Sequence, residues 1–311
     1  MLLLHALALA GSPLVDGPWS HETVTAGELD VHLLVAGPVD APAVVLLHGF
    51  PDSSHGWRTV LPLLSEDHRV YAPDLRGYGA TSAPADGYDL DTLRGDVIAL
   101  FDALDLETAH LIGHDWGAAI TWEVAAHHPD RLETATVLAV PHLAALQQTW
   151  ELESQQRAYK RFANAMTWRI TPWVLARISE ESRADVYHPE LVDDDAMSAA
   201  DQAQYHALFD ERAETRPPLA YYRENFGSWR EVWKRAEAAP PSGVPTLVLW
   251  GEQDAYMMPS NAERSCAFVE ARCEAAVHPD AAHWLQWEQG PWVVERWRAF
   301  IADEPGDTPP G

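Results

Sequence analysis

The feature that most constrains the fold is a regular alternation of short apolar runs with longer helical patterns. Strands that alternate with helices in this way form a parallel sheet, because each return to the same edge needs a crossover, which is usually helical. The sequence therefore predicts an α/β protein with a mostly parallel central sheet flanked by helices. Six runs have the length and composition of buried strands: residues 44–48, 70–72, 109–112, 135–139, 246–250 and 275–278.

The alternation is interrupted once, between residues 141 and 239, where only helical patterns occur. This segment is rich in aromatic residues, among them Trp150, Trp168, Trp173 and Trp229, and Pro-Pro-Ser-Gly follows it. Because proline and glycine mark linkers, we interpret the segment as a helical cap inserted into the sheet domain. The expected parts are an N-terminal core part (1–140), the cap (141–239), a C-terminal core part (240–303) and a flexible tail (304–311).

Composition and charge limit the possible partners. The chain has 311 residues, of which 47% are hydrophobic, enough to bury a core without metal or disulfide support. Its 21 Lys and Arg against 47 Asp and Glu give a net charge of −26, which repels nucleic acid and anionic membranes. The apolar residues 1–10 are too short to span a bilayer and lack the basic residues of a secretory signal. We expect a surface extension there, and whether it is processed stays open.

The two cysteines, Cys266 and Cys273, match no common zinc-binding pattern. They lie close together on a stretch expected to be helical. Reduced thiols in a cytoplasmic protein are the expectation.

The strongest single motif is Gly-His-Asp-Trp-Gly at residues 113–117, between an expected strand and an expected helix. A sharp strand-to-helix turn with flanking glycines is the context of a nucleophile elbow. Its central residue here is Asp115 rather than serine, which excludes a serine esterase. An alternative is that Asp115 only caps the following helix.

His-Gly-Phe-Pro at residues 48–51 follows the first strong strand. Such a turn places the Phe50 N–H at the carboxyl edge of the sheet, where it and the Trp116 N–H would form an oxyanion hole beside Asp115. We interpret His48 as a hydrogen-bonded packing residue.

Two further residues follow strand ends in a meaningful order. Asp254 comes after the fifth run, and His283 comes after the sixth. Nucleophile, acid and histidine, in this chain order, are the triad of an α/β hydrolase.

With these motifs the chain resembles the α/β-hydrolase fold and, within it, the soluble epoxide hydrolase family, from about residue 19 to residue 300. The resemblance implies Asp115 as nucleophile, His283 as the base that activates water, and Asp254 as the acid that orients His283. It also implies two cap tyrosines that hold the epoxide oxygen. Tyr222 and Tyr159 match these positions, and Tyr221 is a possible substitute.

The expected reaction opens an epoxide to a vicinal diol through a hydroxyalkyl ester on Asp115, with no cofactor and no metal. Phe50, Trp116 and Tyr221 are expected to contact a small apolar substrate. The sequence leaves open which epoxide is preferred, the selectivity, and whether the protein is a monomer or a homodimer.

Two other functions remain open. A haloalkane dehalogenase uses the same kind of Asp nucleophile, and the Trp116 indole would then bind halide; Phe50 and the sequence Val140-Pro-His142, which has no acid, argue against it. A non-catalytic small-molecule receptor on a hydrolase scaffold is the alternative from another class.

Overall fold

The computed structural model describes residues 16–150, 154–168, 197–199, 201–202 and 216–303. Eight strands form one sheet, in the order β1-β2-β4-β3-β5-β6-β7-β8. Strand β2 pairs antiparallel with β1 and β4, and the remaining neighbours pair parallel. The strands are β1 (Ser20–Ala26), β2 (Leu29–Ala36), β3 (Ala43–Leu47), β4 (Arg69–Pro73), β5 (Ala109–His114), β6 (Leu132–Leu138), β7 (Thr246–Gly251) and β8 (Cys273–His278).

All six strands predicted from the apolar runs are present, as β3 to β8, and the predicted α/β-hydrolase architecture is confirmed. The hairpin of β1 and β2 was missed. Strand β1 is mostly polar and forms the edge of the sheet, so it carries no apolar run. The sequence signal for this hairpin was Gly27, whose φ of 59° allows the tight turn between the two strands.

The sheet is buried on both faces. Side chains of a strand point alternately to opposite faces, so Val45 and Leu47 of β3 join one apolar cluster while Val44 and Leu46 join another. The first cluster contains residues of α2 and α3, and the second contains residues of α1 and α13. Burial on both faces explains why the central strands read as continuous apolar runs.

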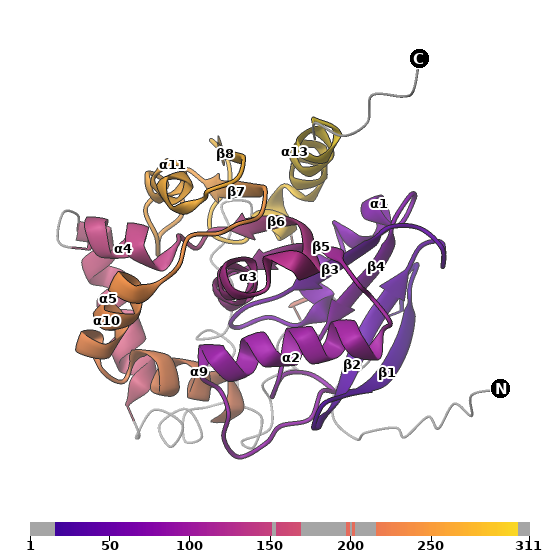
Figure 1. Ribbon diagram of the computed structural model, residues 1–311, viewed down its shortest axis with the longest axis horizontal. Coiled ribbons are helices and arrows are strands. Elements are labelled where there is room, and N and C mark those ends of the chain that lie inside the picture. The colour runs from indigo at the N-terminus through magenta and orange to yellow at the C-terminus, as the bar shows by residue number, and fades with distance from the viewer. Residues whose placement is uncertain (1–15, 151–153, 169–196, 200, 203–215, 304–311) are drawn as a thin grey trace.

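The helices form two groups: one flanks the sheet, and the other lies between β6 and β7 in chain order. In Figure 1 the second group, α4, α5, α9 and α10, gathers at the left of the view, away from β1 and β2. The helices of the first group are α1 (Leu61–Leu64), α2 (Leu90–Ala103), α3 (Trp116–His127), α11 (Asn261–Ser265), α12 (Leu285–Glu288) and α13 (Gly290–Ala302), with the short turns η1 (Ser54–Trp57), η2 (Pro129–Arg131) and η4 (Cys266–Phe268). Those of the second group are α4 (Leu143–Thr149), α5 (Ser154–Thr167), α9 (Arg216–Phe226) and α10 (Trp229–Ala238).

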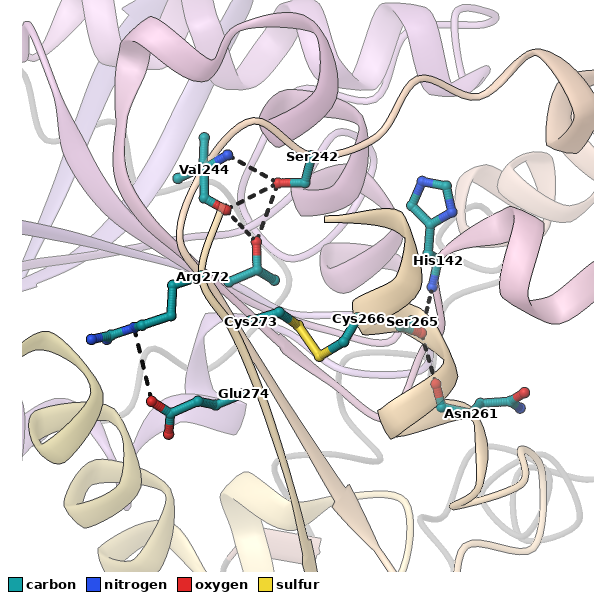
Figure 2. The surroundings of a disulfide bond; sticks show 10 residues. His142, Ser242, Val244, Asn261, Ser265, Cys266, Arg272, Cys273 and Glu274 are labelled. Atoms are coloured by element: carbon teal, nitrogen blue, oxygen red, sulfur yellow. Dashed lines mark hydrogen bonds and ion pairs between the residues drawn. A yellow bond between two sulfur atoms is a disulfide. The ribbon is translucent and has the colours of Figure 1, made fainter. Parts of the chain in front are cut away.

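Cys266 and Cys273 form a disulfide bond, so the expectation of reduced thiols is wrong (Figure 2). Cys266 begins η4 and Cys273 begins β8; they do not share a helix. The turn between them returns the chain and brings the two Cα atoms to 5.4 Å, within the range that a disulfide bridges. With this correction the cysteines no longer argue for a cytoplasmic location.

Several expectations lie outside the described residues. These are the extension at residues 1–10, the tail at residues 304–311 and Trp173. Among the described residues, no helix combines the length and apolarity that crossing a bilayer requires. The same residues contain no group of three or more His, Cys, Asp or Glu side chains placed to hold a metal ion.

Candidate active site

Asp115 lies at the sharp turn between β5 and α3. Its backbone has φ 50° and ψ −118°, a conformation that non-glycine residues rarely adopt. The flanking glycines make the turn possible, because a Cβ at Gly113 would lie 2.2 Å from the Gly117 carbonyl oxygen and a Cβ at Gly117 would lie 2.1 Å from that of Leu47. This geometry is that of a nucleophile elbow and lifts the Asp115 carboxylate above the carboxyl edge of the sheet.

The loop after β3 lies against this carboxylate. The Phe50 backbone N–H donates a hydrogen bond of 2.7 Å to Asp115 Oδ1. The close approach requires Gly49, because a Cβ there would lie 2.4 Å from the Asp115 Cβ. Trp116 is the first residue of α3, where backbone N–H groups have no partner within the helix. Both predicted oxyanion-hole residues therefore flank Asp115.

His283 and Asp254 lie on loops beyond β8 and β7 and meet beside Asp115. His283 Nε2 is 3.5 Å from Asp115 Oδ2, and His283 Nδ1 is 2.9 Å from Asp254 Oδ2. The other oxygen of Asp254 accepts the backbone N–H groups of Tyr256 and Met257, at 2.8 and 3.0 Å. The carboxylate is thus fixed before it orients the imidazole, and the structure brings the three predicted triad residues together.

The charges of the three side chains are coupled. Burial alone lowers the pKa of His283, but the negative charge of Asp254 and the hydrogen bonds to Asp115 and Asp254 outweigh it and raise the pKa to about 10. Burial raises the pKa of Asp115, whereas the hydrogen bond and charge of His283 and the Phe50 N–H lower it, with a net decrease. Asp115 is therefore ionised at neutral pH, as a nucleophile must be.

Tyr159 of α5 and Tyr222 of α9 line the cavity that contains Asp115 and His283. They are 8% and 2% exposed. Burial and the charge of Asp115 raise the pKa of both hydroxyls, although a hydrogen bond with the Trp116 side chain acts in the opposite direction on Tyr222. Both phenols keep their protons at neutral pH and can donate hydrogen bonds.

Tyr221 is not brought to this cavity. Its hydroxyl donates a hydrogen bond of 2.9 Å to the carbonyl oxygen of Arg76, on the core side of α9. Adjacent residues of a helix point about 100° apart, so Tyr222 and Tyr221 cannot both face Asp115. The structure gives no support to Tyr221 as a substrate contact or as a substitute for Tyr222. His48 is a packing residue as expected: its Nδ1 donates to the Gly49 carbonyl and its Nε2 accepts the Leu75 N–H.

Sequence reasoning missed several cavity residues. Phe162, Tyr256, Met257 and Trp284 line the same cavity, together with Phe50. Two of them, Tyr256 and Met257, lie two and three residues after Asp254, and Trp284 follows His283, so their place beside predicted triad positions was the available signal. Phe162 lies one helical turn after Tyr159 on α5, a spacing that puts both on one face.

A second, mainly apolar cavity adjoins Asp115 and follows α3. The residues of α3 that line it recur at helical spacing: Trp116, Ala119, Trp122, Glu123, Ala126 and His127. Its opposite wall comes from the helices between β6 and β7, including Leu146 and Phe226. The nucleophile candidate is therefore reached from two hollows, both lined largely by apolar and aromatic side chains.

Residues 42–289 match the family model of the α/β-hydrolase fold. This match covers most of the chain and agrees with the elbow, the triad geometry and the sheet order, so the protein belongs to the α/β-hydrolase family. The "AB hydrolase superfamily protein YfhM" of Bacillus subtilis is 30% identical over 303 residues, which covers 88% of this chain and 94% of that relative.

More specific similarity is to proteins named as epoxide hydrolases. Epoxide hydrolase 2 of Caenorhabditis elegans is 27% identical over 304 residues, covering 94% of this chain and 82% of the relative. A solved structure from a study of novel epoxide hydrolases in metagenomes of hot environments superposes with a TM-score of 0.80 at 26% identity, covering 92% of this chain and 99% of that one. A point mutant of an epoxide hydrolase from Bacillus megaterium superposes with a TM-score of 0.79 at 22% identity, covering 90% of this chain and 100% of that one, which supports the fold.

Proposed function

We propose that the protein is an epoxide hydrolase that converts small apolar epoxides to vicinal diols through an ester on Asp115. The observation that carries the proposal is the arrangement in one cavity of an ionised carboxylate, two buried phenols and a histidine that is paired with Asp254 behind it. Ring opening leaves an alkoxide, which is a poor leaving group unless a hydrogen-bond donor stabilises it, and protonated phenols are such donors. The similarity to named epoxide hydrolases supports the same reaction.

In the first half-reaction, Asp115 Oδ2 attacks a ring carbon, because Oδ1 is held by the Phe50 N–H. The ring C–O bond breaks as the new C–O bond forms. Tyr159 and Tyr222 donate hydrogen bonds to the departing oxygen, and one of the two phenols gives it a proton, so that the oxygen becomes a hydroxyl and a tyrosinate remains. The product of this half is a hydroxyalkyl ester of Asp115.

In the second half-reaction, His283 takes a proton from water and the hydroxide attacks the Asp115 carboxyl carbon. The Phe50 and Trp116 N–H groups stabilise the oxyanion that forms at Oδ1. The bond to the alkyl oxygen then breaks, and the diol receives the proton from His283. Asp115 is left as a carboxylic acid, and the proton that it releases through solvent restores both its carboxylate and the phenol. Asp254 holds the tautomer of His283 and stabilises its charged form.

Residues 141–239 are proposed to form the cap domain that supplies the phenols. All elements described in this range are helices, and residues of α4, α5 and α9 share an apolar cluster with α3. The mainly apolar wall of the cavity along α3 favours an apolar substrate, because polar groups buried there would lose their hydration without replacement.

The ester is the first test. The variant His283→Gln should form it and fail to hydrolyse it, because the attack on the ring does not use His283. Incubation with styrene oxide should then give an intact protein mass increased by one substrate, whereas Asp115→Asn should give none. A receptor without catalytic function would show no adduct in either variant, and this result would reject the proposal.

The tyrosines discriminate epoxide opening from dehalogenation. Replacement of both Tyr159 and Tyr222 by Phe should slow ester formation from an epoxide by about 10²–10⁴-fold, the usual contribution of general acid catalysis. Ester hydrolysis should change much less. Rapid quench with mass detection measures both steps. Halide release from 1-bromobutane at a rate comparable with diol formation, and unaffected by the double substitution, would favour a haloalkane dehalogenase.

A further inference from the structure

A buried chain of hydrogen bonds lies behind the triad and is used by none of the steps above. His114 Nε2 is 2.9 Å from the backbone carbonyl oxygen of His283, and Gln286 Nε2 is 3.0 Å from His114 Nδ1. The same Gln286 nitrogen is 3.5 Å from Asp52 Oδ2, which also accepts the Trp287 indole N–H at 3.2 Å. His114, Gln286 and Asp52 are 0%, 1% and 1% exposed, so solvent does not compete for these bonds.

The direction of each bond is fixed by chemistry. A carbonyl oxygen only accepts, so His114 must carry its proton on Nε2 and accept at Nδ1. Gln286 must therefore present its NH₂ group to His114. Burial, together with the positive charge of His283, lowers the pKa of His114 to about 3, so this tautomer persists at neutral pH. The Gln286 carbonyl oxygen has no hydrogen-bond partner among the described residues, and the amide keeps this arrangement nonetheless.

Through His114, this chain of hydrogen bonds connects two parts of the candidate site. His114 is the last residue of β5 and directly precedes Asp115, so its bond to the His283 carbonyl ties the loop of the base to the strand of the nucleophile. The bond to Asp254 fixes the His283 ring at Nδ1, and the bond from His114 holds the backbone carbonyl of the same residue. His283, whose Nε2 lies 3.5 Å from Asp115 Oδ2, is thus held both at its ring and at its backbone.

We infer that His114, oriented by Gln286, is a positioning residue that holds His283 for attack of water on the Asp115 ester. This inference rests on the proposed function. Only the second half-reaction requires His283 to reach a water molecule at the Asp115 carboxyl carbon. Loss of the anchor should therefore slow ester hydrolysis and leave ester formation nearly unchanged. A residue with a merely structural role would disturb both steps together.

The test compares His114→Met, which removes both ring nitrogens, with His114→Gln, whose amide nitrogen can reach the position of Nε2. The matched control is His110→Gln on the same strand, where the ring contacts the Thr134 hydroxyl and lies far from Asp115 in the register. Single turnovers of styrene oxide, quenched and read by intact mass, give the rates of ester formation and ester hydrolysis for each protein.

We expect hydrolysis in His114→Met to fall by about 10–100-fold, the order of loss that a small misplacement of a catalytic group causes. Ester should accumulate, and formation should stay within about threefold of wild type on the same reasoning. His114→Gln should recover part of the loss, and the control should match wild type. Gln286→Met should also slow ester hydrolysis selectively, by a smaller factor. This variant takes the place of His114→Met in the test if His114→Met does not fold.

An unchanged ratio of the two rates in His114→Met and Gln286→Met would overturn the inference while the proposed function stands. A proportional fall of ester formation and ester hydrolysis is one form of this result. The inference also fails if His114→Gln recovers none of the lost rate of ester hydrolysis. If wild type forms no ester and no diol, the proposed function fails, and the inference fails with it. The wild-type measurement therefore separates the two failures.

Discussion

At the scale of single residues, the site depends on backbone approaches that only particular side chains permit. Gly49 is a clear case, because the loop after β3 must come close enough for the Phe50 N–H to reach Asp115. The φ of Gly49 is not in the left-handed region, so the requirement for glycine is one of space. A substitution there therefore tests the site without testing the local conformation.

We predict that Gly49→Ala lowers kcat/KM by about 100-fold, because its Cβ would displace the Asp115 side chain and the neighbouring N–H donor. Gly95→Ala is the control: Gly95 is exposed on α2, and a Cβ there meets nothing within 4 Å. The control should retain activity and gain about 0.5–1 kcal/mol in the free energy of unfolding, because alanine favours a helix. Steady-state kinetics and urea unfolding measure both effects, and equal activities would refute the spatial argument.

The charge of His283 gives a second prediction at this scale. Two carboxylates, Asp254 and Asp115, raise its pKa to about 10, so removal of one negative charge should lower it. We expect the titration midpoint of His283 in Asp115→Asn to lie about 1–3 pH units below that of wild type, measured by NMR of the imidazole. Ester formation at Asp115 removes the same charge and should lower the pKa of His283 in the same way, toward the free base that activation of water requires.

The raised pKa of His283 also makes the free energy of unfolding depend on pH in a defined direction. A histidine whose pKa is raised on folding contributes stability that is complete below its unfolded pKa of 6.5 and is lost as the pH rises through about 10. The difference in free energy of unfolding between wild type and His283→Gln should therefore shrink across this interval. A difference that is constant with pH would contradict the raised pKa.

At the scale of elements, an ion pair joins the segment between β6 and β7 to the core. Arg58, directly after η1, binds Asp201 through two hydrogen bonds of 2.8 and 2.7 Å, and its guanidinium lies 3.9 Å from the centre of the Trp287 ring. The two side chains are only 15% and 17% exposed. Paired bonds in a poorly hydrated position are stronger than ordinary surface ion pairs.

We predict that Arg58→Met and Asp201→Asn each lower the free energy of unfolding, with a coupling energy of about 0.5–3 kcal/mol in the double-mutant cycle. The control cycle uses Lys234 and Glu231 on α10, which form an ion pair at 2.9 Å while 55% and 63% exposed. Its coupling should be about 0.2–1 kcal/mol. Equal coupling in both cycles, measured by chemical unfolding, would show that the Arg58–Asp201 pair does not fasten the segment.

At the scale of the whole molecule, the candidate site lies where parallel strands end and the helices between β6 and β7 cover them. Asp115, Asp254 and His283 follow three different strands, and the carboxyl ends of parallel strands meet at one edge of a sheet. Two of the aromatic residues noted in the inserted segment pack against each other: the Trp150 ring centre lies 4.4 Å from that of Trp229. These two side chains have a packing role, whereas Trp168 is 60% exposed.

The sequence by itself determined the sheet strands β3 to β8, the inserted helices and the identity of the triad candidates. These signals are local: apolar runs of strand length, and motifs such as Gly-His-Asp-Trp-Gly whose residues are neighbours in the chain. Chain order also sufficed for Asp254 and His283, because each follows a strand that the apolar pattern reveals. The polar β1 gave no such signal, since an edge strand need not be apolar.

Only the tertiary structure decided which groups meet across the chain. It paired Cys266 with Cys273 through a turn that spacing did not reveal, and it turned Tyr221 toward the Arg76 carbonyl while Tyr222 faces Asp115. It also placed His114 against the His283 carbonyl, 169 residues along the chain. Such contacts depend on the relative orientation of packed elements, which is set by burial over the whole core and leaves no periodic mark on the local sequence.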